Sequence, residues 1–296
     1  MTDSHPPDSG LPASRLLELR LIDFRGKVAW VAGAARPPGI GRAVAIGLAR
    51  LGADVACVDI VDDTAGSEQS FRVVRAALEA TADAVRAEGR RALVLPADVT
   101  DPDAVDASVA ATVADLGRLD VGCNLSGGTG PALGNGLLVD LDPAAWHAAI
   151  DANVTAAFLG AQACARAMIE QGTGGAIVSL SSSAALVAEP GFGAFAAARA
   201  GLVRMTEGMA RELGPSGIRI NAVCPLGVSP ETGGNPGLVA GATSGGRSLE
   251  DWARARIPLG RVQGAEETAN VILFLASDGA SFVSGQSILV AGGAPA

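Results

Sequence analysis

Residues 27–41 of the chain read KVAWVAGAARPPGIG, and residues 42–51 continue as RAVAIGLARL. The first part is an apolar run that ends in a glycine, which is typical of a strand buried in a parallel sheet. A loop containing Gly33, Gly39 and Gly41 follows, and the residues after it have a helical pattern. Glycines in such a loop let the backbone approach a pyrophosphate, and the start of the helix offers aligned amides to it. The stretch therefore predicts a dinucleotide-binding unit of strand, loop and helix.

The same alternation of apolar runs and helical patterns continues along the chain as far as residue 293. We expect strands over 27–34, 54–61, 91–96, 119–125, 176–180 and 218–224, and helices over 102–116 and 146–169. Strands that alternate with helices predict an α/β fold, here a single doubly wound, Rossmann-type domain whose central parallel sheet is flanked by helices. This dinucleotide-binding domain is expected to cover residues 25–296.

Three segments depart from the alternation. Residues 1–24 are a polar, acidic tail and a short amphipathic lead-in, which we expect to be partly disordered. Residues 62–72 form a longer insertion than the alternation needs. Residues 229–256 begin with a stretch rich in glycine, serine and proline, a composition typical of a mobile lid over a substrate.

The composition limits the classes of function. The formal net charge is −9, whereas a nucleic-acid surface needs clustered basic residues, so no nucleic-acid partner is expected. The sequence has neither an apolar run long enough to span a membrane nor a signal-peptide pattern, so no membrane partner is expected. The widely spaced Cys57, Cys123, Cys164 and Cys224 indicate reduced thiols in a cytoplasmic protein. The two histidines do not suggest a metal site.

Asp59 stands at the end of the second expected strand. A carboxylate at this place can accept hydrogen bonds from both ribose hydroxyls of an adenosine, and it repels a 2′-phosphate. The residue therefore favours NAD over NADP as the cofactor. A strand-end acid that simply faces water is the alternative, and the sequence leaves it open.

Residues 176–204 read AIVSLSSSAALVAEPGFGAFAAARAGLVR, which is an apolar strand, three serines, a small-residue loop and an alanine-rich helix. This stretch resembles the active-site segment of the short-chain dehydrogenase/reductase family, and the resemblance extends over nearly the whole chain. In that family a strand-end serine is followed thirteen residues later by a tyrosine, and four residues after that by a lysine. Counted from Ser182, these positions hold Phe195 and Arg199.

The two replaced residues change the chemistry that the resemblance implies. Residues four apart share one face of a helix, so the family's lysine favours the phenolate form of a tyrosine whose pKa is ordinarily about 10. Phe195 has no proton to exchange, and Arg199 keeps the positive charge but stays protonated. The chain contains no tyrosine, and Lys27 is its only lysine, so no displaced pair exists elsewhere.

Other positions agree or disagree with the family one by one. The glycine loop is two residues longer than usual and is similar to that of the divergent enoyl-reductase branch, whose tyrosine position holds Phe192 here. Asn153 matches the family's helix-kinking catalytic asparagine. The alternative is an ordinary polar residue of the helix without a catalytic role. Leu125 replaces an asparagine that ties central strands together in the family, which is a structural departure. Leu226 and Pro230 replace a glycine and a threonine that contacts the nicotinamide amide, so the family's usual seating of the nicotinamide is not expected here.

The resemblance implies two sets of site residues. The catalytic set is Ser182, Asn153, Arg199 and Phe195. The residues expected to contact NAD are Gly33, Arg36, Gly39, Ile40, Gly41, Asp59, Asp98, Val99, Asn124, Gly127, Arg199 and Pro225.

Several functions remain open at this point. The favoured one is an NAD-binding protein that performs an atypical reaction (cyclisation, dehydration, isomerisation or atypical redox chemistry) on a small anionic or enolisable substrate. The alternatives are a catalytically silent binding or structural subunit and a weak ordinary carbonyl reductase. An engineered tyrosine-to-phenylalanine trap would have kept the lysine, so Arg199 disfavours it. The resemblance also implies a homo-oligomer, a dimer or tetramer, paired through helices 143–170 and 192–213.

Overall fold

The structure is a computed structural model that describes residues 22–36, 38–61, 75–232, 234 and 236–295. The expected N-terminal tail, apart from its last residues, and the expected insertion at 62–72 lie outside the described residues. Within them, Phe24 is buried and its backbone N–H donates to the carbonyl of Leu51, which fixes the entry into the first strand.

Seven parallel strands form one sheet in the order β3-β2-β1-β4-β5-β6-β7. They are β1 (Val28–Ala32), β2 (Asp54–Asp59), β3 (Ala92–Pro96), β4 (Val121–Asn124), β5 (Gly175–Leu180), β6 (Ile218–Pro225) and β7 (Ser287–Val290). The direction of winding reverses between β1 and β4, and ligands of such sheets bind outside the carboxyl ends of the strands at that point. The predicted doubly wound α/β fold is confirmed.

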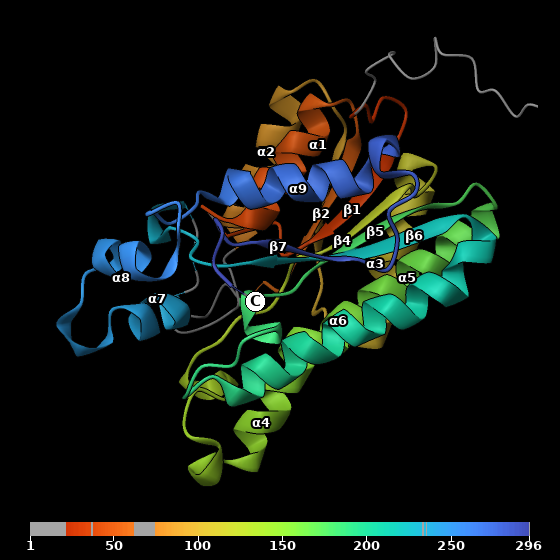
Figure 1. Ribbon diagram of the computed structural model, residues 1–296. Coiled ribbons are helices and arrows are strands. Elements are labelled where there is room, and N and C mark those ends of the chain that lie inside the picture. Colours follow the sequence, from red (N-terminus) through yellow and green to blue (C-terminus); the bar gives the residue numbers. More distant parts are fainter. Residues whose placement is uncertain (1–21, 37, 62–74, 233, 235, 296) are drawn as a thin grey trace, which may run out of the picture.

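Helices cover both faces of the sheet (Figure 1). One face carries α1 (Ile40–Arg50), α2 (Arg75–Ala87) and α9 (Ala265–Ala276). The other carries α3 (Pro102–Leu116), α5 (Ala156–Gln171) and α6 (Gly193–Leu213). Each face has its own apolar core, which is built mainly from alanine, valine and leucine because the chain has few aromatic residues.

The helix expected over residues 146–169 is interrupted at Asn153, where the family resemblance predicts a kink. It consists of α4 (Pro143–Ile150), a π-helical turn (Asp151–Thr155) and α5, because one side chain in the turn binds a loop elsewhere in the fold, as described below. The expected lid segment also contains regular structure, namely α7 (Pro236–Ala242) and α8 (Leu249–Arg256). These two outer helices lie together beside the layered body (Figure 1).

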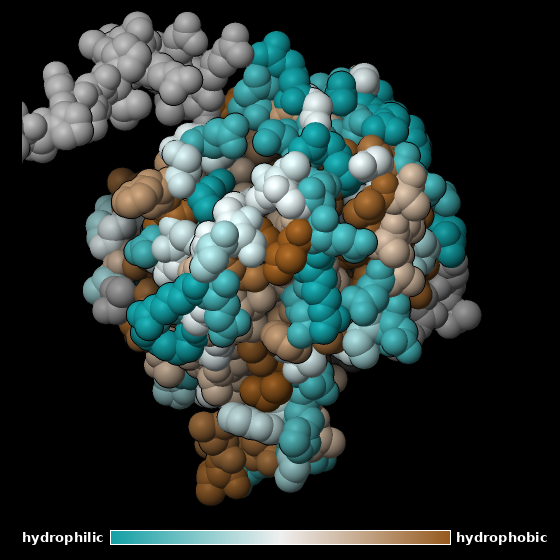
Figure 2. Space-filling model, turned by 90° about the vertical axis from the view of Figure 1, so that its right-hand side faces the viewer, coloured by the Kyte–Doolittle hydropathy of each residue, from teal (hydrophilic) through white to brown (hydrophobic). Residues whose placement is uncertain are grey.

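None of the helices in the described part of the chain is both long and apolar enough to cross a membrane. Nor do three or more potential metal ligands gather within the described residues. All four cysteines are buried and free. Exposed apolar side chains gather at the tip below α4, where Leu137, Leu138 and Val139 protrude (Figure 2).

Candidate functional site

A cleft of about 1170 Å³ opens where the strands end. The expected site residues that line it are Gly33, Arg36, Gly39, Ile40, Gly41, Asp59, Asp98, Val99, Gly127, Ser182, Phe195, Arg199 and Pro225. Asn124 and Asn153 are not among its lining residues. The cleft has an inner half along β1, β2 and β3 and an outer half between β5, α6 and the outer helices.

The glycine loop brings α1 close to the end of β1. A Cβ atom at Gly41 would overlap the carbonyl oxygen of Gly33, so only glycine allows this approach. Gly33 itself has φ +82°, the left-handed region that favours glycine. No side chain caps α1 at Gly39. The first amides of the helix are therefore available to an anionic ligand in the cleft.

Asp59 forms the adjoining wall of the inner half. Its two carboxylate oxygens accept hydrogen bonds from the backbone N–H groups of Ala35 and Ile60, each at 2.9 Å. Burial raises the pKa of Asp59 to about 6, although these bonds and the nearby Arg36 act in the opposite direction. Asp59 is therefore ionised at neutral pH but loses its charge in mildly acidic solution.

Asn153 is buried in the π-helical turn and holds the loop after β4. Its amide nitrogen donates to the carbonyls of Gly128 (2.8 Å) and Ala149 (2.9 Å), and its oxygen accepts from the Gly128 N–H at 2.9 Å. A side chain that takes a carbonyl from the preceding helical turn disturbs the regular ladder there, which accounts for the π turn. Asn153 thus positions the wall of the cleft.

Asn124 is directed elsewhere. Its amide donates to the hydroxyl of Ser179 on β5 at 3.2 Å, and its side chain packs against Gly160 of α5. Both neighbours lie inside the fold. In the structure, therefore, the side chain of Asn124 links β4 to β5 and faces away from the cleft.

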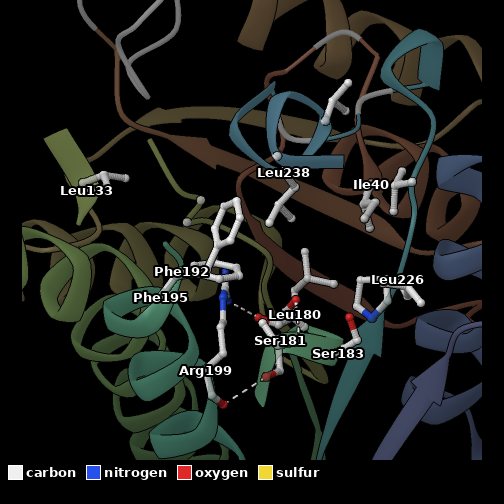
Figure 3. Close-up of a pocket in the computed structure, with 18 of the residues that line it drawn as sticks. Ile40, Leu133, Leu180, Ser181, Ser183, Phe192, Phe195, Arg199, Leu226 and Leu238 are labelled. Carbon is white, nitrogen blue, oxygen red and sulfur yellow. Dashed lines mark hydrogen bonds between the residues drawn. The ribbon is translucent and has the colours of Figure 1, made fainter. Parts of the chain in front are cut away.

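Arg199 extends from α6 toward the end of β5 (Figure 3). It is 3 % exposed, its Nη1 donates to the carbonyl of Leu180, and its guanidinium carbon lies 5.2 Å from the ring centroid of Phe195. A Cβ on Gly127 would come within 2.7 Å of Nη2, so this nitrogen borders the cleft at a glycine with φ +119°. The guanidinium therefore fills the space between α6 and the loop after β4.

Within the part of the chain that the structure describes, no carboxylate balances the charge of Arg199. Its Nε is buried without a hydrogen-bond partner. Burial lowers the pKa of Arg199 to about 10, opposed by the Cys224 thiol, and the group stays charged at neutral pH. A buried cation without a partner is costly, so an anion in the cleft would find a ready site here.

The serines after β5 stand beside this cation. Ser181 donates its hydroxyl to the backbone carbonyl of Arg199 at 3.0 Å, which ties the strand end to α6. The hydroxyl oxygen of Ser182 accepts from the Ala184 N–H at 3.2 Å, so its own hydrogen is left for another acceptor. Both side chains line the cleft.

The outer half of the cleft is largely apolar. Phe192 and Phe195 line it from the α6 side and Leu238 of α7 from the other (Figure 3). Trp252 of α8 lines the same region. At the mouth, Arg256 of α8 donates from Nη1 to Oε1 of Glu189 at 2.5 Å. This ion pair joins the outer helices to the loop before α6.

Several lining residues of the outer half are absent from the sequence-based site, among them Glu189, Leu238, Arg247, Trp252 and Arg256. One signal was available in the sequence. Ser248 followed by Asp251 and an apolar-polar pattern is a helix start, and in the structure Ser248 accepts from the Asp251 N–H at 3.0 Å. This signal predicts where α8 begins, but it does not predict which of its side chains face the cleft.

Comparison with known proteins gives a consistent result. Residues 33–295 match the family model described as enoyl-(acyl carrier protein) reductase. Cyclohexanol dehydrogenase of Rhodococcus sp. (strain TK6) is 37% identical over 278 residues, which cover 92% of this chain and 97% of that protein.

Two solved structures are similar over nearly their whole length. A short-chain type dehydrogenase/reductase from Mycobacterium marinum has a TM-score of 0.79 at 31% identity and covers 93% of this chain, with 98% of its own chain matched. Carveol dehydrogenase from Mycobacterium avium, solved in complex with NAD, has a TM-score of 0.83 at 32% identity. The match covers 92% of this chain and 98% of that one.

Proposed function

Because the chain belongs to the short-chain dehydrogenase/reductase family, we propose that it binds NAD(H) and acts on a small anionic or enolisable substrate without a tyrosine–lysine pair. Cyclisation, dehydration, isomerisation and hydride transfer on an acidic substrate are reactions of this kind. The observation that carries the proposal is the buried, unpaired guanidinium of Arg199 beside Phe195.

The inner half of the cleft fits a dinucleotide. The uncapped start of α1 and the close approach at Gly41 suit a pyrophosphate, and Asp59 suits an adenosine ribose. A similar structure was solved with NAD, which supports a nicotinamide cofactor. When bound, NAD(H) supplies a donor or acceptor of hydride. Asp98 and Val99 after β3 would border its adenine.

The nicotinamide end of the cleft then falls near Gly127, Leu180 and Arg199. Here the free donors of Arg199 would bind an oxygen that carries or develops negative charge, and Ser182 would donate its free hydroxyl hydrogen to the same group. Asn153 would keep the loop at Gly128 in place. Phe195 supplies an apolar surface and no proton, so these residues stabilise an anion rather than protonate it.

Weak ordinary redox chemistry is the second candidate, since the named relatives are dehydrogenases. Restoring the family's tyrosine and lysine distinguishes this ordinary redox activity from the proposed atypical reaction. The double variant Phe195→Tyr with Arg199→Lys is expected to reduce generic activated ketones with NADH within about tenfold of the unchanged protein, because the pocket is shaped around an arginine and an apolar ring.

A gain of about 10²–10⁴ in that assay would instead show an ordinary reductase that had lost only its general acid. The single variant Phe195→Tyr is the matched control, because it adds the phenol and keeps the guanidinium. A protein that binds NADH yet turns over no enolisable substrate in either form would contradict the proposed activity and indicate a silent family member.

Asp59 should decide between NAD and NADP. We expect NAD(H) to bind at least tenfold more tightly than NADP(H) at neutral pH, because the ionised carboxylate repels the 2′-phosphate. The carboxylate is charged above its pKa of about 6 and neutral below it, so the preference should shrink as the pH falls through that value. Calorimetry with both cofactors across this range checks it. Asp59→Asn should show the smaller preference at every pH, and equal affinities in the unchanged protein at neutral pH would refute the assignment.

We also propose a homo-oligomer, a dimer or tetramer, in the cytoplasm. Phe158 and Ile169 are apolar side chains of α5 that are 39% and 49% exposed, and Leu138 at the neighbouring tip is 57% exposed. Light scattering at micromolar concentration should give the mass of a dimer or tetramer, and Phe158→Asp should lower it by placing a charge in the contact. A monomeric mass for the unchanged protein would be contrary to this expectation.

A further inference from the structure

Arg247, just before α8, differs from the other charged groups of the outer helices. It is exposed, lines the cleft and has no partner among the described residues. The charges that follow it are paired: Arg254 with Glu250 at 2.5 Å and with Asp251 at 3.9 Å, and Arg256 with Glu189. The unpaired cation of this segment is therefore the one that faces the cleft.

The outer half of the cleft, which Arg247 lines, is largely apolar. Phe192, Leu238, Leu249 and Trp252 line the outer half of the cleft together with it. The backbone of α7 lies close to Phe192, since a Cβ on Gly241 would come within 2.6 Å of the ring. A ligand that contacts both features needs an apolar body and an anionic end.

The other charges of the cleft leave this cation available. Glu189 is held by Arg256 at the mouth, and Asp59 and Asp98 belong to the inner half, where the adenosine would bind. Asp151 lines the cleft in the π-helical turn and accepts from the hydroxyl of Thr155 at 3.2 Å. Arg36 also lines the cleft but lies near Asp59 in the inner half. Among the described residues, Arg199 deep in the cleft and Arg247 at its outer wall are therefore the arginines without a carboxylate partner on the substrate side.

We propose that Arg247 binds the carboxylate of the substrate, and that the substrate is a carboxylic acid whose reacting oxygen is separated from its carboxylate by an apolar carbon body. This inference rests on the proposed function, which places the reacting oxygen at Arg199. An arginine fork can hold a carboxylate through two charge-assisted hydrogen bonds, and the apolar wall accepts the carbon body.

The test compares octanoate with octanamide, which have the same shape but differ in charge. Calorimetric titration of the full chain, at low ionic strength and with and without NADH, should give octanoate an affinity about tenfold or more above that of octanamide. Arg247→Gln should remove this difference and leave octanamide unchanged, and Arg247→Lys should restore part of it. Arg254→Gln is the matched control: it removes an exposed arginine of α8 that does not line the cleft, and it should leave both affinities unchanged.

Equal binding of the two ligands, no binding of octanoate at millimolar concentration, or a preference for octanoate that survives in Arg247→Gln would each overturn the proposal. The last result would place the carboxylate elsewhere, at Arg199 for example. A preference that depends on Arg247 in a protein that fails to bind NADH would contradict the proposed function and leave the carboxylate site standing.

Discussion

Arg199→Met is expected to weaken the binding of an enolate ligand about a hundredfold while leaving the protein at least as stable as before. The guanidinium is buried, has an unpaired Nε and faces no carboxylate within the described part of the chain, so its removal takes away the partner of the ligand's negative charge. The same removal relieves the protein of a desolvated cation. Replacing buried charges by apolar groups of similar volume is often neutral or stabilising by about 1–4 kcal/mol.

The two effects are measured on one pair of proteins. The affinity for 1,3-cyclohexanedione, which is largely an enolate at neutral pH, is compared by calorimetry with that for the neutral cyclohexanone in the presence of NADH. Thermal unfolding gives the stability, with about 2–4 °C for each kcal/mol.

Arg204→Met is the control, because Arg204 lies on α6, is exposed and pairs with Glu207 at 2.6 Å. We expect it to change neither quantity appreciably. Undiminished enolate binding in Arg199→Met would end the proposed role of this residue, and so would equal binding of the two ketones by the unchanged protein.

Gly41→Ala is expected to lower the affinity for NADH at least about a hundredfold and to destabilise the fold by about 1–3 kcal/mol. The added methyl group would overlap the carbonyl oxygen of Gly33, which is backbone and cannot rotate away. The start of α1 must then move from the end of β1, and its free amides move with it.

Gly208→Ala supplies the comparison. Gly208 lies inside α6, and a Cβ there would meet nothing within 4 Å, so alanine should raise stability slightly through its better helix propensity. Fluorescence titration with NADH and thermal unfolding of both variants give the result. Full NADH affinity in Gly41→Ala would show that the cofactor is not bound at this loop.

The order of elements was predictable because it depends on local patterns. The helix expected over 102–116 matches α3 residue for residue, since Asp101 caps its start, proline occupies its first turn and Gly117 ends it in the left-handed region. The apolar runs marked the first six strands, because strands covered on both faces exclude polar residues. The interruption at Asn153 was expected from the family resemblance but not from the local helical pattern, because the partner that holds its side chain, Gly128, lies 25 residues away in the chain.

The sequence by itself determined the doubly wound fold, the glycine loop and the acid at the end of β2. It also placed Phe195 and Arg199 at the positions where the family resemblance predicts tyrosine and lysine. Only the tertiary structure decided what surrounds them. Pairing and burial of a charge depend on neighbours from distant segments. Arg199 meets Leu180, Phe195 and Gly127 but no carboxylate of the described residues, whereas Arg256 meets Glu189, 67 residues away. In the sequence, Arg199 and Arg256 are both simply arginines, and nothing local distinguishes the buried, unbalanced charge from the paired one. Its chemistry is set by whether the fold leaves the charge unbalanced.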